Sequence, residues 1–191
     1  MAAAYWKLKQ WTDAADQYAC ALRLDQGNEG YRRNLKHMLN ENGNDLYGQG
    51  QYHDAAQSYQ RAIGIDPEDA VLYSNLASAY REMKDWPHAV EEYKQAMLIE
   101  PFHDGYVNSL GNTYFSQGDY YLAAQYFRRA IGLNPKIAVY HANLAETCGL
   151  LNQWEQAVEC YKRAVALDPH DAVLKSNLAR AEAHLAAHAG A

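Results

Sequence analysis

The sequence repeats with a period of about 34 residues over most of its length. Prolines mark the period, and alanines and aromatic residues recur at fixed distances from them. The positions that keep the interval are Pro67, Pro101, Pro135 and Pro169; Ala55, Ala89, Ala123 and Ala157; Tyr59, Tyr93, Phe127 and Tyr161; and Ala62, Ala96, Ala130 and Ala164. A period of this length is typical of stacked repeats, in which each unit contacts only its neighbours, and not of a single globular core.

The repeating unit resembles the tetratricopeptide repeat, a helix–turn–helix of the same length. The motif is complete in the third unit, which reads Tyr73-x2-Leu76-Ala77-x2-Tyr80 and then Ala89-x3-Tyr93, Ala96 and Pro101. The fourth and fifth units repeat this pattern, whereas the second is weaker in its first helix, with Asn42-Gly43-x2-Leu46. A half-preserved first unit has Tyr5, Trp11, Ala14, Tyr18 and Ala21. The resemblance covers about residues 1 to 169.

The predicted fold is all-α: a right-handed α-solenoid of stacked tetratricopeptide helix–turn–helix repeats with a C-terminal capping helix. We expect one repeat domain over residues 1–191. Its units are about 1–28 (partial), 29–69 (with an extended first helix), 70–103, 104–137 and 138–171, followed by the cap at 172–188. Helix pairs are expected at about 2–9 with 12–24, 29–49 with 52–65, 69–82 with 86–98, 103–116 with 120–132, and 137–150 with 154–166. Tight turns inside the repeats are expected at Lys84-Asp85, Gly118-Asp119 and Asn152-Gln153.

The second unit departs from the period. The step from Ala14 to Ala55 is longer than the interval that separates Ala55 from Ala89. The surplus of seven is nearly two helical turns, since one turn takes about 3.6 residues. A longer first helix absorbs it and keeps the buried face nearly in phase, with a possible break near Gly43 because glycine weakens a helix.

The start of the chain forms a second departure, because the first unit lacks the opening residues of its first helix. The outer face of segment 12–24 is then poorly covered, and Trp6, Leu8 and Trp11 lie at this edge. Either upstream sequence covers the edge, or a partner or a second copy of the chain does. We therefore select these three residues as a possible assembly edge, through which the chain could form a homo-oligomer.

Composition narrows the range of partners. The formal net charge is −6, and the basic pairs Arg32-Arg33 and Arg128-Arg129 do not make a groove, so no nucleic-acid partner is predicted. No apolar run approaches the roughly 20 residues that span a bilayer, so no membrane insertion is expected. The first residues lack the pattern of a signal peptide. Three cysteines without metal-ligand spacing favour a reducing, cytoplasmic location.

The resemblance places the first helices of the units on the inner, concave face, where tetratricopeptide proteins commonly bind extended peptides. Asn75 and Asn143 occupy the sixth position of their units, Asn44 and Asn112 occupy the ninth, and Asn108 precedes Asn112 by one turn. A side-chain amide has two donor hydrogens and an acceptor, so it can bind a peptide backbone without reading its side chains. This pattern resembles the repeat region of O-GlcNAc transferase and that of the peroxisomal targeting-signal receptor. The alternative is that the asparagines are solvated or hydrogen-bond a neighbouring repeat.

The rest of the predicted inner face is neutral and partly apolar, which suits an extended, largely uncharged peptide. The residues selected for peptide binding are Asn44, Tyr47, Asn75, Arg81, Asn108, Asn112, Phe115, Asn143 and Leu150. The family's two-carboxylate clamp is not preserved. Asn44 and Asn75 match its asparagines, but Asn40, Gly105 and Ser109 stand where the clamp has its cations. Without charge-assisted bonds we reject that function in its usual form.

No sequence pattern indicates catalysis. A phosphate-binding glycine loop, a His-Glu-x-x-His pair and a nucleophile elbow are all missing, so we predict no enzyme activity and no catalytic residues. His184 and His188 have no third ligand nearby, so no metal or cofactor site is predicted. The chain is therefore predicted to be a protein-interaction module with a protein or peptide partner. Two alternatives stay open: an assembly scaffold that uses its N-terminal edge or convex face, and the non-catalytic repeat region of a larger enzyme or co-chaperone.

Overall fold

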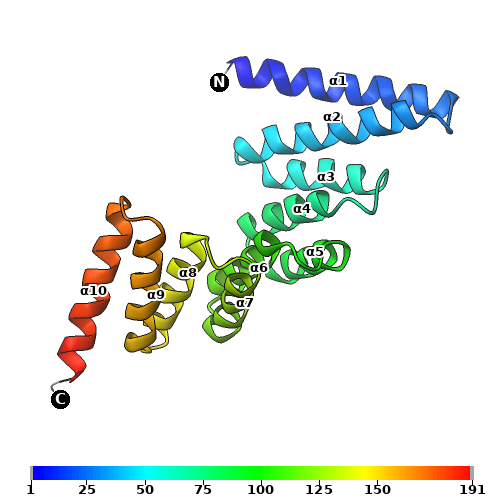
Figure 1. The fold of residues 1–191 in the computed structure, drawn as a ribbon. Helices are drawn as coiled ribbons and strands as arrows, with labels where there is room; N and C mark the ends of the chain where they lie inside the picture. Colours follow the sequence, from blue (N-terminus) through cyan, green and yellow to red (C-terminus); the bar gives the residue numbers. More distant parts are fainter. Residues whose placement is uncertain (1, 190–191) are drawn as a thin grey trace. The chain divides into compact units, whose positions relative to one another are not determined.

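The computed structural model describes residues 2–189, and the side chains of residues 10–187. This part of the chain forms ten helices and no strand, as the all-α prediction requires (Figure 1). It divides into two compact units, Met1–Pro101 and Phe102–Ala191. Unit 1 holds α1 (Ala2–Leu24), α2 (Glu29–Gly48), α3 (Tyr52–Ile63), α4 (Ala70–Glu82) and α5 (Trp86–Ile99). Unit 2 holds α6 (Asp104–Gln117), α7 (Tyr120–Leu133), α8 (Ala138–Leu150), α9 (Trp154–Leu167) and α10 (Ala172–Ala189).

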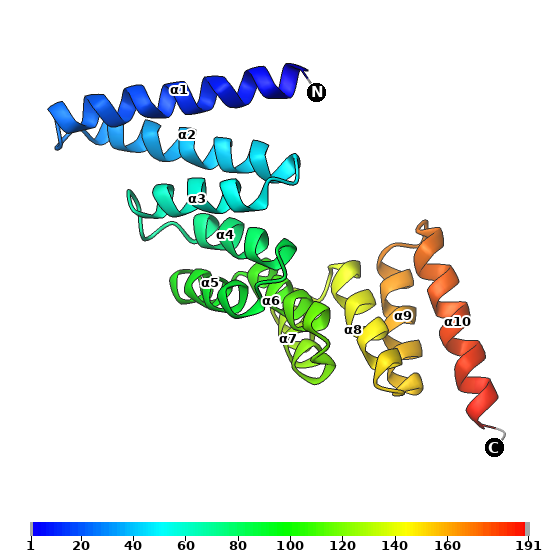
Figure 2. The same ribbon diagram turned by 180° about the vertical axis from the view of Figure 1, so that it is seen from behind.

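Within each unit, every helix packs on the next one along the chain, as the views from both sides agree (Figures 1 and 2). The first helices of neighbouring repeats also touch, α2 with α4 in unit 1 and α6 with α8 in unit 2. The last helix, α10, packs on α9 and buries Leu174 and Ala181. It therefore covers the end of unit 2 in the way expected of a capping helix.

The turns inside the repeats share one backbone conformation. A residue with positive φ ends the first helix of each pair, and the residue after it donates its N–H to a carbonyl five residues back, as in the Schellman motif. The left-handed residues recur at the repeat interval, at Gly50, Lys84, Gly118 and Asn152. The closing bonds are Gln51 N to Leu46 O, Asp85 N to Tyr80 O, Asp119 N to Tyr114 O, and Gln153 N to Cys148 O, at 2.8–3.0 Å. The three turns predicted from the sequence are thus confirmed.

Small and large residues alternate in the core at the repeat interval. The alanines of the second helices are fully buried: Ala55, Ala62, Ala89, Ala96, Ala123, Ala130, Ala157 and Ala164. The aromatic residues between them, Tyr59, Tyr93, Phe127 and Tyr161, are also buried and fill the space that the alanines leave. Paired helices can approach closely because the alanines have only a methyl group at the contact.

The N-terminal prediction is wrong in one respect. Segments 2–9 and 12–24 do not form a helix pair, because α1 is one continuous helix of 23 residues. No glycine or proline between Lys9 and Thr12 offers a turn, and Trp11 is half-buried against α2. Its indole Nε1 donates to Asp45 Oδ2 at 2.8 Å, which ties the middle of α1 to α2.

The extended helix of the second unit is observed. With 20 residues, α2 is seven longer than α4 and α8, which have 13 each. Leu35, Leu39 and Leu46 are buried on one side of it. The helix is not broken at Gly43. This glycine instead admits the ring of Tyr59, because a Cβ built there would lie only 2.5 Å from a ring carbon.

Candidate functional site

Three of the selected asparagines come together in unit 2, on the first helices of neighbouring repeats. Asn143 of α8 donates from Nδ2 to Asn108 Oδ1 at 3.0 Å and to Asn112 Oδ1 at 3.2 Å, both on α6. All three side chains are half-buried. A side-chain amide has two N–H groups, so both hydrogens of Asn143 are engaged and its Oδ1 is left to accept. We call Asn108, Asn112 and Asn143 the asparagine cluster.

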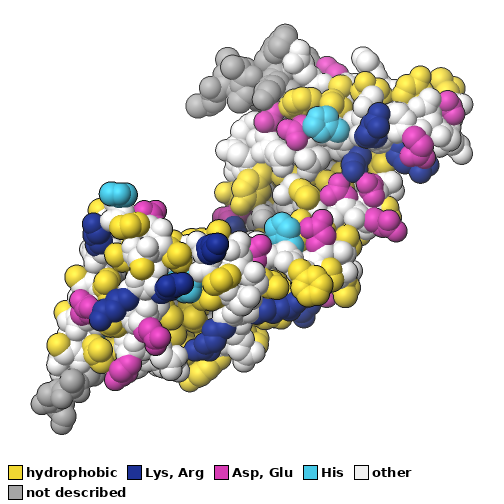
Figure 3. Space-filling view, viewed as in Figure 1, with side chains coloured by type: hydrophobic (Ala, Val, Ile, Leu, Met, Phe, Trp, Pro, Cys, Tyr) yellow, Lys and Arg dark blue, Asp and Glu magenta, His cyan; other side chains and the backbone are white. Residues whose placement is uncertain are grey.

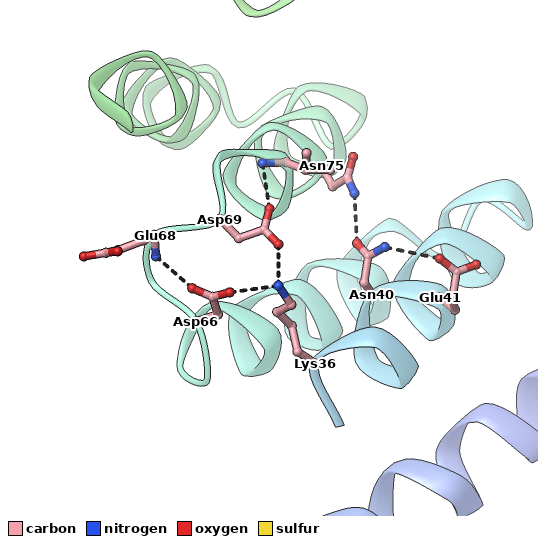
Figure 4. A network of polar contacts seen from close by, with 8 residues as sticks. Lys36, Asn40, Glu41, Asp66, Glu68, Asp69 and Asn75 are labelled. Atoms are coloured by element: carbon pink, nitrogen blue, oxygen red, sulfur yellow. Dashed lines mark hydrogen bonds and ion pairs between the residues drawn. The ribbon is translucent and has the colours of Figure 1, made fainter. Parts of the chain in front are cut away.

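Unit 1 carries a related pair two repeats earlier in the chain. Asn75 of α4 donates from Nδ2 to Asn40 Oδ1 of α2 at 3.0 Å, and Asn40 in turn donates to Glu41 Oε1 (Figure 4). Beside this pair, Lys36 Nζ lies 2.8 Å from both Asp66 Oδ2 and Asp69 Oδ2 (Figure 4). These hydrogen bonds raise the pKa of Lys36, and the bond to Lys36 lowers the pKa of Asp66. The loop before α4 is therefore tied to α2 by one lysine.

In unit 1 a repeating hydrogen bond joins a tyrosine hydroxyl on the second helix of each repeat to a polar side chain on its first helix. In unit 1 the hydroxyl of Tyr59 donates to Asn44 Oδ1 at 2.9 Å, and that of Tyr93 lies 2.8 Å from Ser78 Oγ. Both pairs have the same separation in the sequence. That spacing also pairs Asn112 with Phe127, which has no hydroxyl. Unit 2 has a cavity of about 70 Å³ at this place, lined by Asn112, Phe115, Phe127, Asn143 and Glu146. We call it the Phe127 cavity.

A larger depression lies between α8 and α10. Its volume is about 370 Å³, and its lining includes Leu150, Trp154, Tyr161, Asn177 and Arg180. Glu146 lines this α8–α10 groove as well as the Phe127 cavity. The two hollows therefore meet at one residue of α8, next to the asparagine cluster.

Comparison with known sequences decides the family. A TPR repeat model matches residues 43–84, and two tetratricopeptide repeat models match residues 70–99 and 103–170. The chain belongs to the tetratricopeptide repeat family. Tetratricopeptide repeats are generally non-catalytic protein-interaction repeats, so this chain is a protein–protein interaction module.

Solved structures show the same tetratricopeptide fold. A crystal structure of MamA aligns with a TM-score of 0.69 at 19% identity, covering 83% of this chain and 89% of MamA. A second MamA structure aligns at 0.65 and 18% identity, covering 85% and 92%. A structure from a functional characterization of Pseudomonas aeruginosa pilF aligns at 0.71 and 21% identity, covering 78% and 68%. At these identities the likeness concerns the helical solenoid alone.

The residues of unit 1 that were selected for peptide binding already form hydrogen bonds or ion pairs within the chain. Arg81 Nη2 lies 3.0 Å from Glu82 Oε1, so it is one half of an ion pair and not a lone cation. The hydroxyl of Tyr47 donates to the same oxygen at 3.3 Å, and burial is the main cause that raises the pKa of Tyr47. Asn44 is exposed but accepts from Tyr59 and donates to Glu41 Oε1.

The selected hydrophobic residues of unit 2 differ in exposure. Leu150 is 49% exposed at the end of α8, whereas Phe115 is half-buried and packs edge-on against Tyr120, with ring centroids 5.4 Å apart. Of the adjacent tyrosines, Tyr120 is half-buried and Tyr121 is 70% exposed. Of the two selected residues, Leu150 is therefore the one that offers a large apolar surface to a ligand without rearrangement.

The possible assembly edge has one member that the structure describes. Trp11 is half-buried and hydrogen-bonded to Asp45, so much of its side chain already packs within the chain. The side chains of Trp6 and Leu8 lie outside the described residues. The edge stays a prediction.

Sequence reasoning placed Asn40 and Glu146 on the inner face but did not select them for peptide binding, and it did not use the missing hydroxyl of Phe127. The last signal was present in the repeat register, where the series reads Tyr59, Tyr93, Phe127, Tyr161. Only a comparison of the atoms that these side chains touch shows that Tyr59 and Tyr93 make the contact and that Phe127 does not.

The histidines and cysteines considered in the sequence have the following surroundings in the part of the chain that the structure describes. No group of three or more His, Cys, Asp or Glu side chains gathers there as a metal site. His184 stacks on Trp154 with ring centroids 4.3 Å apart, and the side chain of His188 lies outside the described residues. Cys20 is exposed, whereas Cys148 is buried and Cys160 is half-buried. Burial raises the pKa of both of these thiols, that of Cys160 to about 11.

None of the described helices is both long enough and apolar enough to cross a bilayer. On the face shown in Figure 3, acidic and basic side chains are interspersed, so the side chains coloured there form no continuous basic stripe.

Proposed function

We propose that this tetratricopeptide module binds an extended, largely uncharged peptide segment of a partner protein, and that unit 2 holds the main site. The observation that supports this most directly is the continuity at Glu146. The Phe127 cavity and the α8–α10 groove share that residue, and Asn112 and Asn143 of the asparagine cluster line the same cavity. An extended peptide needs such a run of polar and apolar subsites, not a single closed pocket.

The asparagine cluster offers hydrogen bonds that suit a peptide backbone. Because Asn143 engages both of its hydrogens, it orients the oxygens of Asn108 and Asn112 toward itself. The amide groups of these two residues are left with N–H donors, and Asn143 is left with an acceptor oxygen. A peptide backbone alternates carbonyl acceptors and N–H donors, so it can satisfy both kinds of group.

The α8–α10 groove supports binding of apolar side chains. Leu150, Trp154 and Tyr161 contribute carbon surface, and Asn177 and Arg180 stand at the polar side of the groove. Arg180 Nη2 donates to Asn177 Oδ1 at 3.2 Å, which holds the two side chains together. A volume of about 370 Å³ accommodates one or two side chains of a peptide.

The proposal is tested with a displayed library of unstructured peptides, selected on the full chain. The variant Asn112→Ser/Asn143→Ser removes two amides of the cluster but introduces the residue that other repeats carry at these positions, Ser78 and Ser109, so the fold should persist. We expect the parent chain to select related sequences whose affinity drops about tenfold or more in the variant.

The control is Tyr121→Ser, which removes an exposed aromatic residue from α7 outside the proposed site. Circular dichroism must show that all variants are as helical as the parent. Peptides that bind the asparagine variant as tightly as the parent, or that are lost only with Tyr121→Ser, would place the site elsewhere and overturn the proposal.

A further inference from the structure

The Phe127 cavity has the lining of a site for a small cation. We propose that it receives the side-chain ammonium of a lysine in the bound peptide. This inference rests on the proposed function and adds one specific residue to an otherwise uncharged ligand. The origin of the cavity, its acceptors, its size and its apolar wall each support it.

The cavity exists because one repeat lacks a hydroxyl. In unit 1 the hydroxyls of Tyr59 and Tyr93 reach the equivalent residue of the preceding helix, Asn44 or Ser78, at 2.9 and 2.8 Å. Phe127 is fully buried in the same register and has no such atom. The neighbouring polar groups, Asn112 and Asn143, then turn toward each other and leave a polar hollow beside the ring.

Two of the polar residues around this hollow, Asn143 and Glu146, offer acceptors to a ligand, whereas Asn112 keeps its N–H donors. Asn143 has engaged both amide hydrogens, so only its Oδ1 can meet a ligand. Glu146 adds a carboxylate, and among the side chains that the structure describes none forms an ion pair with it. A group with several N–H donors and a positive charge satisfies both residues, whereas a carboxylate would face repulsion from Glu146.

The size of the hollow favours an ammonium. Its volume of about 70 Å³ is small beside the volume of about 370 Å³ of the α8–α10 groove. A lysine ammonium is a compact charge with three rotatable donors, while the guanidinium of arginine is a larger planar group. The buried ring of Phe127 completes the lining, and the half-buried ring of Phe115 offers carbon on which the methylene stem of a lysine can pack while its ammonium meets the oxygens.

Two substitutions separate the parts of this site. Phe127→Tyr adds the hydroxyl that Tyr59 and Tyr93 place beside their partners, so it should fill the cavity while the fold accepts it. Glu146→Gln removes the charge and keeps the shape. Glu155→Gln is the matched control, because Glu155 is an exposed residue of α9 that lines neither the cavity nor the α8–α10 groove.

The test measures binding of a selected lysine peptide and of its twin with norleucine in place of lysine, by isothermal titration on the full chain. For the parent we expect the norleucine twin to bind about tenfold more weakly, as one lost charge-assisted contact implies. Phe127→Tyr and Glu146→Gln should weaken the lysine peptide and leave its twin nearly unchanged. Glu155→Gln should change neither.

The outcomes distinguish this inference from the proposed function. If selected peptides depend on Asn112 and Asn143 but contain no recurrent lysine, or bind Phe127→Tyr and Glu146→Gln as tightly as the parent, the lysine site is wrong and peptide binding stands. The lysine site is also wrong if arginine replaces lysine without loss. If no selected peptide depends on the asparagines, both proposals fail.

Discussion

Replacing Gly43 by alanine tests the packing of α2 on α3, because two effects of opposite sign meet at this position. Alanine favours the interior of a helix over glycine by about 1 kcal/mol. The added methyl, however, would lie 2.5, 2.8 and 2.9 Å from three carbons of the Tyr59 ring. Ordinary carbon contacts are about 3.5–4.0 Å, so the ring must move by about 1 Å.

The ring of Tyr59 has little freedom to move. It is 2% exposed, and its hydroxyl is held by Asn44 Oδ1 at 2.9 Å. Overpacking a well-filled core costs about 1–3 kcal/mol, which exceeds the gain in helix propensity. We therefore expect Gly43→Ala to lower the free energy of unfolding of unit 1 by about 1 kcal/mol, the difference between about 2 lost and about 1 gained.

Gly48→Ala is the matched control in the same helix. No atom lies within 4 Å of a Cβ built at Gly48, so only the propensity acts and stability should rise by about 0.5 kcal/mol at this helix end. Both variants are compared with the parent by urea unfolding, followed by far-ultraviolet circular dichroism. If Gly43→Ala raises stability as much as Gly48→Ala does, the close approach of Tyr59 to α2 is not as described.

Two further substitutions test contacts between neighbouring repeats. Lys36→Met should destabilise unit 1 by about 1 kcal/mol at neutral pH. The hydrogen bond with Lys36 is the main cause that lowers the pKa of Asp66 in the folded protein. The stability from this ion pair is therefore fully present above the ordinary carboxyl pKa of 3.8, and it is lost as the pH falls through the lower pKa of folded Asp66. Urea unfolding from pH 7 to pH 3 should therefore show a shallower acid loss in the variant, and an identical slope would contradict the ion pair. Tyr140→Phe removes a hydroxyl that donates to Asp104 Oδ2 at 2.9 Å and should destabilise unit 2 by about 1–2 kcal/mol. Burial and the bond to Asp104 raise the pKa of Tyr140 to about 12, so the difference from the parent should hold below pH 10 and disappear as the pH rises through about 12.

The repeat period was sufficient to predict the helices and their turns. The period predicted turns at Lys84-Asp85 and Gly118-Asp119, and the structure shows a left-handed residue, Lys84 or Gly118, in each of them. Buried alanines and aromatics could also be predicted, since their spacing alone assigns them to the contact between helices. The N-terminal helix could not, because its half-preserved motif suggested a turn that the residues around Trp11 do not support.

The site was only half predictable. Repeat register placed Asn75 and Asn143 on the first helices, but it could not tell whether their amides face solvent or the next repeat. That choice depends on how closely α6 approaches α8, a distance that no periodicity encodes. The structure favours the alternative of contact with a neighbouring repeat, since Asn143 bonds Asn108 and Asn112, and Asn75 bonds Asn40. Peptide binding by what these amides leave free stays a prediction.

The three cysteines supply a built-in chemical reporter. Cys20 is exposed, so a thiol reagent can reach it directly, whereas Cys148 and Cys160 pack between α8 and α9 with thiols that stay protonated well above neutral pH. Because the thiolate is the reactive form, modification of the buried Cys148 and the half-buried Cys160 should be slow, and separation of these helices should speed it. A dye can therefore label the protein at Cys20 on α1 without any substitution. The slower alkylation of Cys148 and Cys160 measures how often the repeat beside the proposed site opens, and a bound peptide that keeps this repeat closed should slow it further.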